Sequence, residues 1–140
     1  MGNRREETLK TFIGIRRTSD GLLKEVKKDV KRYNLNINEF AVLEVLFHKG
    51  PMSTNDITEK ILLANSSTTY IVDQLCAKKM VVRKSLSEDK RVSIVSLTAQ
   101  GKKLIKEIFP CHSEMIESMF EGLTTEEIIE LRQLLKKMKK

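Results

Sequence analysis

Residues 65–97 carry the sequence NSSTTYIVDQLCAKKMVVRKSLSEDKRVSIVSL, and this stretch decides the fold. Its first part spaces apolar side chains at helical intervals and predicts a short helix. The stripe that this helix would bury consists of Thr68, Ile71, Val72 and Leu75. Two β-branched runs follow, Val81 to Leu86 and Val92 to Leu97, and they enclose a polar turn, which predicts a hairpin. A recognition helix followed by a β-wing is the order of a winged helix-turn-helix.

The opposite face of this helix is polar. Its outward side chains are Ser66, Ser67, Thr69, Tyr70 and Gln74. Hydroxyl and amide groups of this kind can hydrogen-bond the phosphates and base edges of DNA. A winged helix can also serve as a module for protein contacts, but that alternative predicts an apolar or acidic face. The hydroxyl-rich face, with lysines at its far end, favours double-stranded DNA.

Helical patterns flank this stretch on both sides. Apolar residues recur at helical spacing from Leu9 to Tyr33, with an expected weak point at Ser19-Asp20-Gly21. The residues that can cap the other helices are Asn36 with Glu39, Ser53 with Asp56, Thr98, and Thr124 with Glu127. Pro110 is expected to kink the helix that follows Thr98. The pattern predicts a mainly α chain with about six helices and a β-hairpin wing.

Length and composition indicate one ordinary globular domain. The chain has 140 residues, of which 40% are hydrophobic, and this is enough to bury a core. We expect a single domain, 1–140, with the DNA-binding part at 34–98 and long dimerisation helices at 1–33 and 99–140. These helices carry apolar stripes that a second copy would cover, unless they pack only on their own core. A two-fold dimer would place two recognition helices about 34 Å apart.

Positive charge is concentrated at two places in the sequence. The chain has 26 basic and 19 acidic residues, a formal net charge of +7. Residues 1–32 hold 10 basic and 5 acidic side chains, and residues 65–97 hold 6 and 3. A surface that neutralises phosphates has this distribution. A basic solvated surface without a partner is the alternative.

Several classes of protein are excluded by missing motifs. The chain lacks a phosphate-binding loop, a nucleophile elbow, a His-x-x-x-His metal pair and a dinucleotide glycine pattern, so we expect no enzyme, cofactor or metal site. No apolar run approaches the ~20 residues of a membrane span, and the amino terminus does not match a signal peptide. Cys76 and Cys111 lack metal-ligand spacing and predict free thiols in a reducing, cytoplasmic compartment.

These features together resemble the MarR family of bacterial transcriptional regulators, over nearly the whole chain. The motifs that carry the resemblance are Asn38-Glu39-Phe40-Ala41-Val42-Leu43, His48-Lys49-Gly50-Pro51, Val72-Asp73-Gln74-Leu75 with Lys78-Lys79, and Asp89-Lys90-Arg91 with Ser96-Leu97-Thr98 and Gly101. The segments that look like the MhqR-type branch of quinone-responsive repressors are Phe40-Ala41-Val42-Leu43-Glu44, Ile61-Leu62-Leu63-Ala64, Thr69-Tyr70-Ile71-Val72-Asp73 and Glu107-Ile108-Phe109-Pro110.

The resemblance implies roles for the wing and the recognition helix. Arg91 would enter the minor groove at the wing tip, and Asp89 would pair with it, although an ordinary exposed turn pair is the alternative. Gln74 would suit adenine, and the Thr69 methyl group would suit thymine. The cations implied to contact phosphates are Lys78, Lys79, Arg83, Lys84 and Lys90.

The resemblance also implies an effector pocket between the first, second and fifth helices. The candidate lining residues are Phe12, Phe40, Glu44, Phe47 and His112. Aromatic rings, a carboxylate and an imidazole together would suit an aromatic diol. The alternatives are that Glu44 is exposed at the edge of its stripe and that His112 is a satisfied core or interface histidine.

The sequence thus predicts a homodimeric repressor that leaves its operator when a small aromatic effector such as a quinone or hydroquinone binds. Thiol-based redox sensing is the rival switch. Members of the family that sense peroxides place their cysteine in the first helix, which has none here. Cys76 is expected to pack in the winged core, which leaves Cys111, beside His112, as the more reactive thiol.

Overall fold

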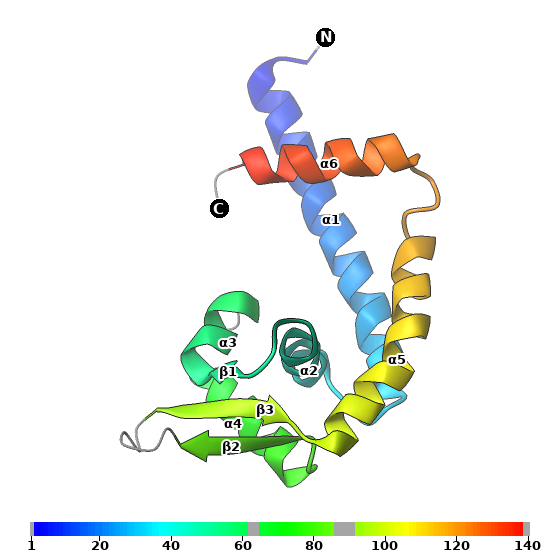
Figure 1. Ribbon diagram of the computed structural model, residues 1–140. Helices are drawn as coiled ribbons and strands as arrows, with labels where there is room; N and C mark the ends of the chain where they lie inside the picture. The colour runs from blue at the N-terminus through cyan, green and yellow to red at the C-terminus, as the bar shows by residue number, and fades with distance from the viewer. Residues whose placement is uncertain (1, 62–64, 86–91, 139–140) are drawn as a thin grey trace. The chain divides into compact units, whose positions relative to one another are not determined.

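The structure is a computed structural model that describes residues 2–61, 65–85 and 92–138, with the backbone alone for residues 65–67. It divides the chain into two compact units, Met1–Ile108 and Phe109–Lys140. The described elements, labelled in Figure 1, are α1 (Arg4–Lys31), α2 (Ile37–Lys49), β1 (Met52–Ser53), α3 (Thr54–Ile61), α4 (Asn65–Ala77), β2 (Val81–Ser85), β3 (Ser93–Leu97), α5 (Ala99–Ser118) and α6 (Thr125–Lys137). The predicted mainly α architecture with a hairpin is confirmed.

Local side-chain caps start the helices where the sequence places them. Asn36 and Glu39 form both hydrogen bonds of a capping box at the start of α2. The Glu39 backbone N–H donates to Asn36 Oδ1 over 2.8 Å, and the Asn36 N–H donates to Glu39 Oε1 over 3.0 Å. Thr124 and Glu127 repeat this pattern before α6, and the Ser53 hydroxyl accepts from the Asp56 N–H before α3. Each such cap contributes about 1 kcal/mol.

Two helices end in the same turn, with a left-handed residue just after the last helical turn. After α1, Asn34 has φ 60° and the Leu35 N–H donates back to the Val30 carbonyl. After α4, Lys79 has φ 64° and the Met80 N–H donates to the Leu75 carbonyl. This 6→1 hydrogen bond defines the Schellman motif. It ends α4 at Ala77.

A three-stranded antiparallel sheet has the order β1-β3-β2. The pairing of β2 with β3 runs from Val81 opposite Leu97 to Ser85 opposite Ser93, which confirms the predicted hairpin. Strand β1 was not predicted, and it pairs Met52 with Val95. It has only two residues, too few to show an alternating pattern, and it forms because β3 offers a free edge.

The first unit has its own hydrophobic core, to which helices α2, α3 and α4, the first part of α5 and the small sheet contribute (Figure 1). Its fully buried large side chains include Leu43, Ile57, Leu75, Ile105 and Ile108. The predicted stripe of α4 is confirmed, because Thr68, Ile71, Val72 and Leu75 are all buried. The polar face of α4 is thereby directed away from the core.

The two terminal helices contribute little to this core. Helix α1 runs unbroken through the predicted weak point at Ser19-Asp20-Gly21, and only its last turns are buried, at Asp29 and Val30. In α6, which the structure describes completely, no residue is buried. Pro110 lies inside α5, which continues to Ser118. The division at residues 34 and 98 between a DNA-binding part and dimerisation helices stays a prediction.

Candidate nucleic-acid interface

The outward face of α4 presents polar side chains on a fixed support. Thr69 and Tyr70 are exposed, and Gln74 is half-buried. On the inner side, the hydroxyls of Thr58 and Thr68 share a hydrogen bond of 2.7 Å, which joins α3 to α4. The predicted side chains of Ser66 and Ser67 lie outside the described residues. The remaining groups match the size and chemistry needed to contact base edges.

Tyr70 and Gln74 are paired on this face. The Gln74 amide nitrogen donates to the Tyr70 hydroxyl over 3.1 Å. An amide nitrogen carries two N–H groups, so a second donor and the carbonyl oxygen of Gln74 remain for a base edge. The hydroxyl of Tyr70, a residue that is 64% exposed, therefore restrains the orientation of the Gln74 amide.

Arg83 connects strand β2 of the wing to helix α4 and thereby braces the hairpin. From β2, its guanidinium contacts Asp73 Oδ1 at 2.6 Å, the Thr69 carbonyl at 3.3 Å and Cys76 Sγ at 3.8 Å. The phosphate contact that the resemblance implies for Arg83 stays a prediction. Its ion-pair partner Asp73 could be seen in the sequence only as part of a family motif.

The other predicted cations fall into three groups. Lys84 and Lys79 are exposed, and their contacts with phosphates stay predictions. Lys78 is bound within the fold, with its ammonium 2.8 Å from Glu39 Oε2. The wing-tip residues Asp89, Lys90 and Arg91 lie outside the described residues. Their roles at the minor groove stay predictions.

Thr98 and Gly101 join the end of α4, the end of β3 and the start of α5. The Thr98 hydroxyl donates to the Lys79 carbonyl over 2.7 Å and accepts from the Gly101 N–H over 3.0 Å, as a cap of α5 should. The Thr98 N–H donates to the Met80 carbonyl over 3.0 Å. A Cβ atom on Gly101 would collide with this same carbonyl oxygen. The site therefore requires glycine at position 101.

The predicted effector residues differ widely in exposure. In the first unit, Phe40 is buried in the core, Glu44 and Phe47 are half-buried on α2, and Phe12 is 56% exposed. In the second unit, His112 is buried on α5. Glu44 is thus neither fully solvated nor fully enclosed, and Phe40 contributes to the core as well as to one face of α2.

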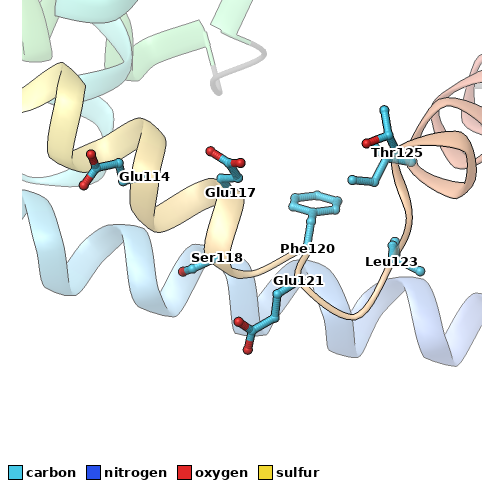
Figure 2. Close-up of a pocket in the computed structure, with 8 residues that line it drawn as sticks. Glu114, Glu117, Ser118, Phe120, Glu121, Leu123 and Thr125 are labelled. Carbon is cyan, nitrogen blue, oxygen red and sulfur yellow. The ribbon is translucent and has the colours of Figure 1, made fainter.

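The second unit has a pocket of about 420 Å³ at the turn between α5 and α6 (Figure 2). It is lined by Glu114, Glu117, Ser118, Phe120, Glu121, Leu123, Thr125 and Ile128. None of the five predicted effector residues is among them. Three carboxylates and one aromatic ring are the main chemical groups of this pocket, and the sequence analysis did not single it out.

Comparison with known proteins identifies the family. The model of the MarR family matches residues 35–93. The transcriptional regulator MhqR of Bacillus subtilis (strain 168) is 38% identical over 133 residues, which cover 95% of this chain and 92% of MhqR. The chain belongs to the MarR family. A second regulator of that organism, YkoM, is 36% identical over 79% of this MarR chain and 71% of its own length.

Solved structures agree with the MarR fold. The regulator BldR from Sulfolobus solfataricus is 26% identical, with a TM-score of 0.82 over 98% of this chain and 100% of its own. NadR in complex with 4-hydroxyphenylacetate is 26% identical, with a TM-score of 0.75 over 89% and 88% of the two chains. The protein is therefore a MarR-family transcriptional regulator with a winged-helix DNA-binding fold, and its relatives are not enzymes.

The described residues, 2–61, 65–85 and 92–138, also bear on membrane and metal binding. No helix there is long and apolar enough to cross a membrane. No group of three or more His, Cys, Asp or Glu side chains there is arranged to hold a metal ion. Cys76 is half-buried and Cys111 is exposed, and both are free thiols.

Proposed function

We propose that this MarR regulator is a homodimeric repressor that binds a pseudopalindromic operator and is released by a small aromatic effector of the quinone or hydroquinone kind. The observation that carries the first half is the outward face of α4, where Tyr70 and Gln74 form a hydrogen-bonded pair above a buried stripe. Arg83 holds the wing strand to the same helix. A braced helix presents base-reading groups with little loss of side-chain freedom on binding.

Exposed apolar side chains on the terminal helices support the homodimer. On α1 they are Leu9, Phe12, Ile13, Ile15 and Leu23, and on α6 they are Ile129, Leu131, Leu134 and Leu135. Large exposed apolar patches mark interaction surfaces in soluble proteins. A second copy that covers both helices would form the closed two-fold symmetry that half-sites of an operator require.

Helix α2 supports the aromatic effector. Glu44 and Phe47 are half-buried there beside the buried Phe40, so a carboxylate lies close in sequence to two aromatic rings on one helix. The relative NadR was solved with 4-hydroxyphenylacetate, a phenol. We propose that Phe12, Phe40, Glu44 and Phe47 contribute to a site in which Glu44 accepts a hydrogen bond from a phenolic hydroxyl.

The test is a fluorescence-anisotropy titration of the protein on its own upstream DNA, with and without hydroquinone, under reducing conditions. We expect tight, salt-sensitive binding that hydroquinone abolishes. Glu44→Gln should keep the DNA affinity but need about tenfold more hydroquinone, a change of about 1.4 kcal/mol for a lost charged hydrogen bond. The matched control is Glu25→Gln, an equal charge change at an exposed position of α1. If Glu44→Gln and Glu25→Gln are released from DNA at the same hydroquinone concentration, Glu44 is not part of the effector site.

Thiol control is a second candidate, favoured by one contact. Cys76 Sγ lies 3.8 Å from the Arg83 guanidinium that braces the wing, so oxidation at Cys76 would disturb this brace. This switch would be supported if peroxide treatment abolishes DNA binding by the wild-type protein but not by Cys76→Ser. If peroxide abolishes DNA binding by Cys76→Ser but not by Cys111→Ser, the redox switch would instead be the exposed thiol of Cys111 on α5.

A further inference from the structure

Lys78, just after α4, has its ammonium group surrounded by acceptors from a distant part of the chain. Its Nζ lies 2.7 Å from the Asn34 carbonyl oxygen. It also lies 2.8 Å from Glu39 Oε2 and 3.1 Å from Glu39 Oε1. A lysine has three N–H donors, and two of them have acceptors here, the Asn34 carbonyl oxygen and Glu39 Oε1. The ion pair with the Glu39 carboxylate compensates the charge of Lys78 within the fold.

Glu39 is buried and needs a cation. Its side chain is only 3% exposed, compared with 30% for Lys78. A buried carboxylate is costly unless it is paired and hydrogen-bonded, and removal of its partner leaves an uncompensated charge. Glu39 already serves the capping box of α2 through Asn36. The same carboxylate thus starts α2 and binds Lys78.

The Asn34 carbonyl is the second acceptor of the Lys78 ammonium group, and we call the contacts of Lys78 with Asn34 and Glu39 the Lys78 tie. Asn34 is the left-handed residue of the turn between α1 and α2, at φ 60°. Lys78 therefore connects the end of the recognition helix to both sides of this turn, across 44 and 39 positions in sequence. Because α4 ends in its own Schellman turn at Lys79, the tie acts on a rigid end.

We propose that Lys78 is a positioning residue for DNA recognition. It holds the carboxyl end of α4 on the α1–α2 turn and thereby sets the orientation of Thr69, Tyr70 and Gln74. It contributes to operator affinity through this orientation and not through neutralisation of a phosphate. The inference rests on operator binding by α4 and refines the role that the sequence gave to Lys78.

The test compares Lys78→Met, Glu39→Gln and the control Lys79→Met with the wild-type protein. Operator affinity is measured by anisotropy at several salt concentrations. A phosphate contact contributes about 0.9 to the slope of log affinity against log salt. We expect Lys78→Met and Glu39→Gln to lower affinity about tenfold at each salt concentration with the wild-type slope. Gln at position 39 keeps the capping box, so only the charge partner is lost.

Two results would overturn the proposal. One is a slope reduced by about 0.9 in Lys78→Met, which would make Lys78 a phosphate ligand. The other is unchanged affinity in Glu39→Gln, because a buried carboxylate matters to DNA only through Lys78. The double variant should bind the operator about as weakly as either single variant, since both substitutions remove the same Lys78–Glu39 ion pair.

Thermal unfolding measured without DNA tests the contacts of Lys78 with Glu39 and Asn34 independently of operator binding. Lys78→Met and Glu39→Gln should unfold at a lower temperature than the wild type, whereas Lys79→Met should not. Equal unfolding temperatures for all four proteins would contradict the tie itself. A wild-type protein that fails to bind its upstream DNA, with the unfolding differences present, would refute the proposed operator function and leave the tie as a structural one.

Discussion

The winged part of the molecule, residues 35–97, and the terminal helix α6 use apolar side chains in opposite ways. In the winged part, Leu43, Ile57 and Leu75 are fully buried, Lys78 connects the end of α4 to Glu39 of α2, and Arg83 connects β2 to α4. In α6, Leu134 is 51% exposed and no residue is buried. The winged part is therefore stabilised by its own chain, whereas α6 gains burial only from another surface.

The largest effect should follow from a charge on the exposed apolar face of α6. Leu134→Asp should convert a dimer to a monomer, because a carboxylate buried at an apolar interface is strongly unfavourable. Operator affinity should then fall about 100-fold, since two linked heads gain 10²–10⁴ over one. Sedimentation equilibrium and anisotropy titration measure the two quantities.

The control for this variant is Gln133→Asp. It makes the same charge change on the neighbouring residue, which is polar in the wild-type chain. We expect Gln133→Asp to stay dimeric and to bind the operator normally. A Leu134→Asp protein that still sediments as a dimer would show that α6 is not part of the interface.

The second largest effect should come from a Gly→Ala substitution, which we compare at position 101 and at position 21. Gly101→Ala places a methyl group against the Met80 carbonyl, a backbone atom held by Thr98, and should lower the free energy of unfolding by about 2 kcal/mol. Gly21→Ala lies inside α1, and beyond the adjacent residues and the backbone of its own helix no atom lies within 4 Å of the new Cβ. It should raise the free energy of unfolding by about 0.5–1 kcal/mol, because glycine is unfavourable in a helix interior.

Urea unfolding at one fixed protein concentration measures both changes, since a dimer's stability depends on concentration. Effects of the same sign in the two variants would contradict the contrast between a tightly packed winged part and a loosely covered α1.

Local chemistry explains which features were predictable from sequence. The caps at Asn36 and Thr124 act over three residues, so their motifs are visible in the sequence itself. The buried stripe of α4 follows from helical periodicity. These features need no knowledge of the rest of the fold, and all of them are confirmed.

The features that the sequence did not reveal depend on distant partners. Strand β1 exists because Met52 pairs with Val95, and no pattern within two residues announces it. For Lys78 and Arg83 the sequence indicates phosphate contacts, because lysine and arginine after a recognition helix are typical of that role, but it does not reveal their partners within the chain. Their acceptors, Glu39 and Asp73, are brought to them only by folding.

The smallest effect concerns the two left-handed turn residues, Asn34 and Lys79, which end equivalent Schellman turns. Asparagine tolerates this conformation because its short side chain hydrogen-bonds locally, whereas lysine has no such compensation. Lys79→Gly should therefore raise the free energy of unfolding by about 0.5–1 kcal/mol, and Asn34→Gly by a few tenths at about the limit of urea unfolding measurements. If Asn34→Gly stabilises the protein as much as Lys79→Gly, the asparagine side chain gives no compensation at the end of α1, and the two left-handed residues are equally strained.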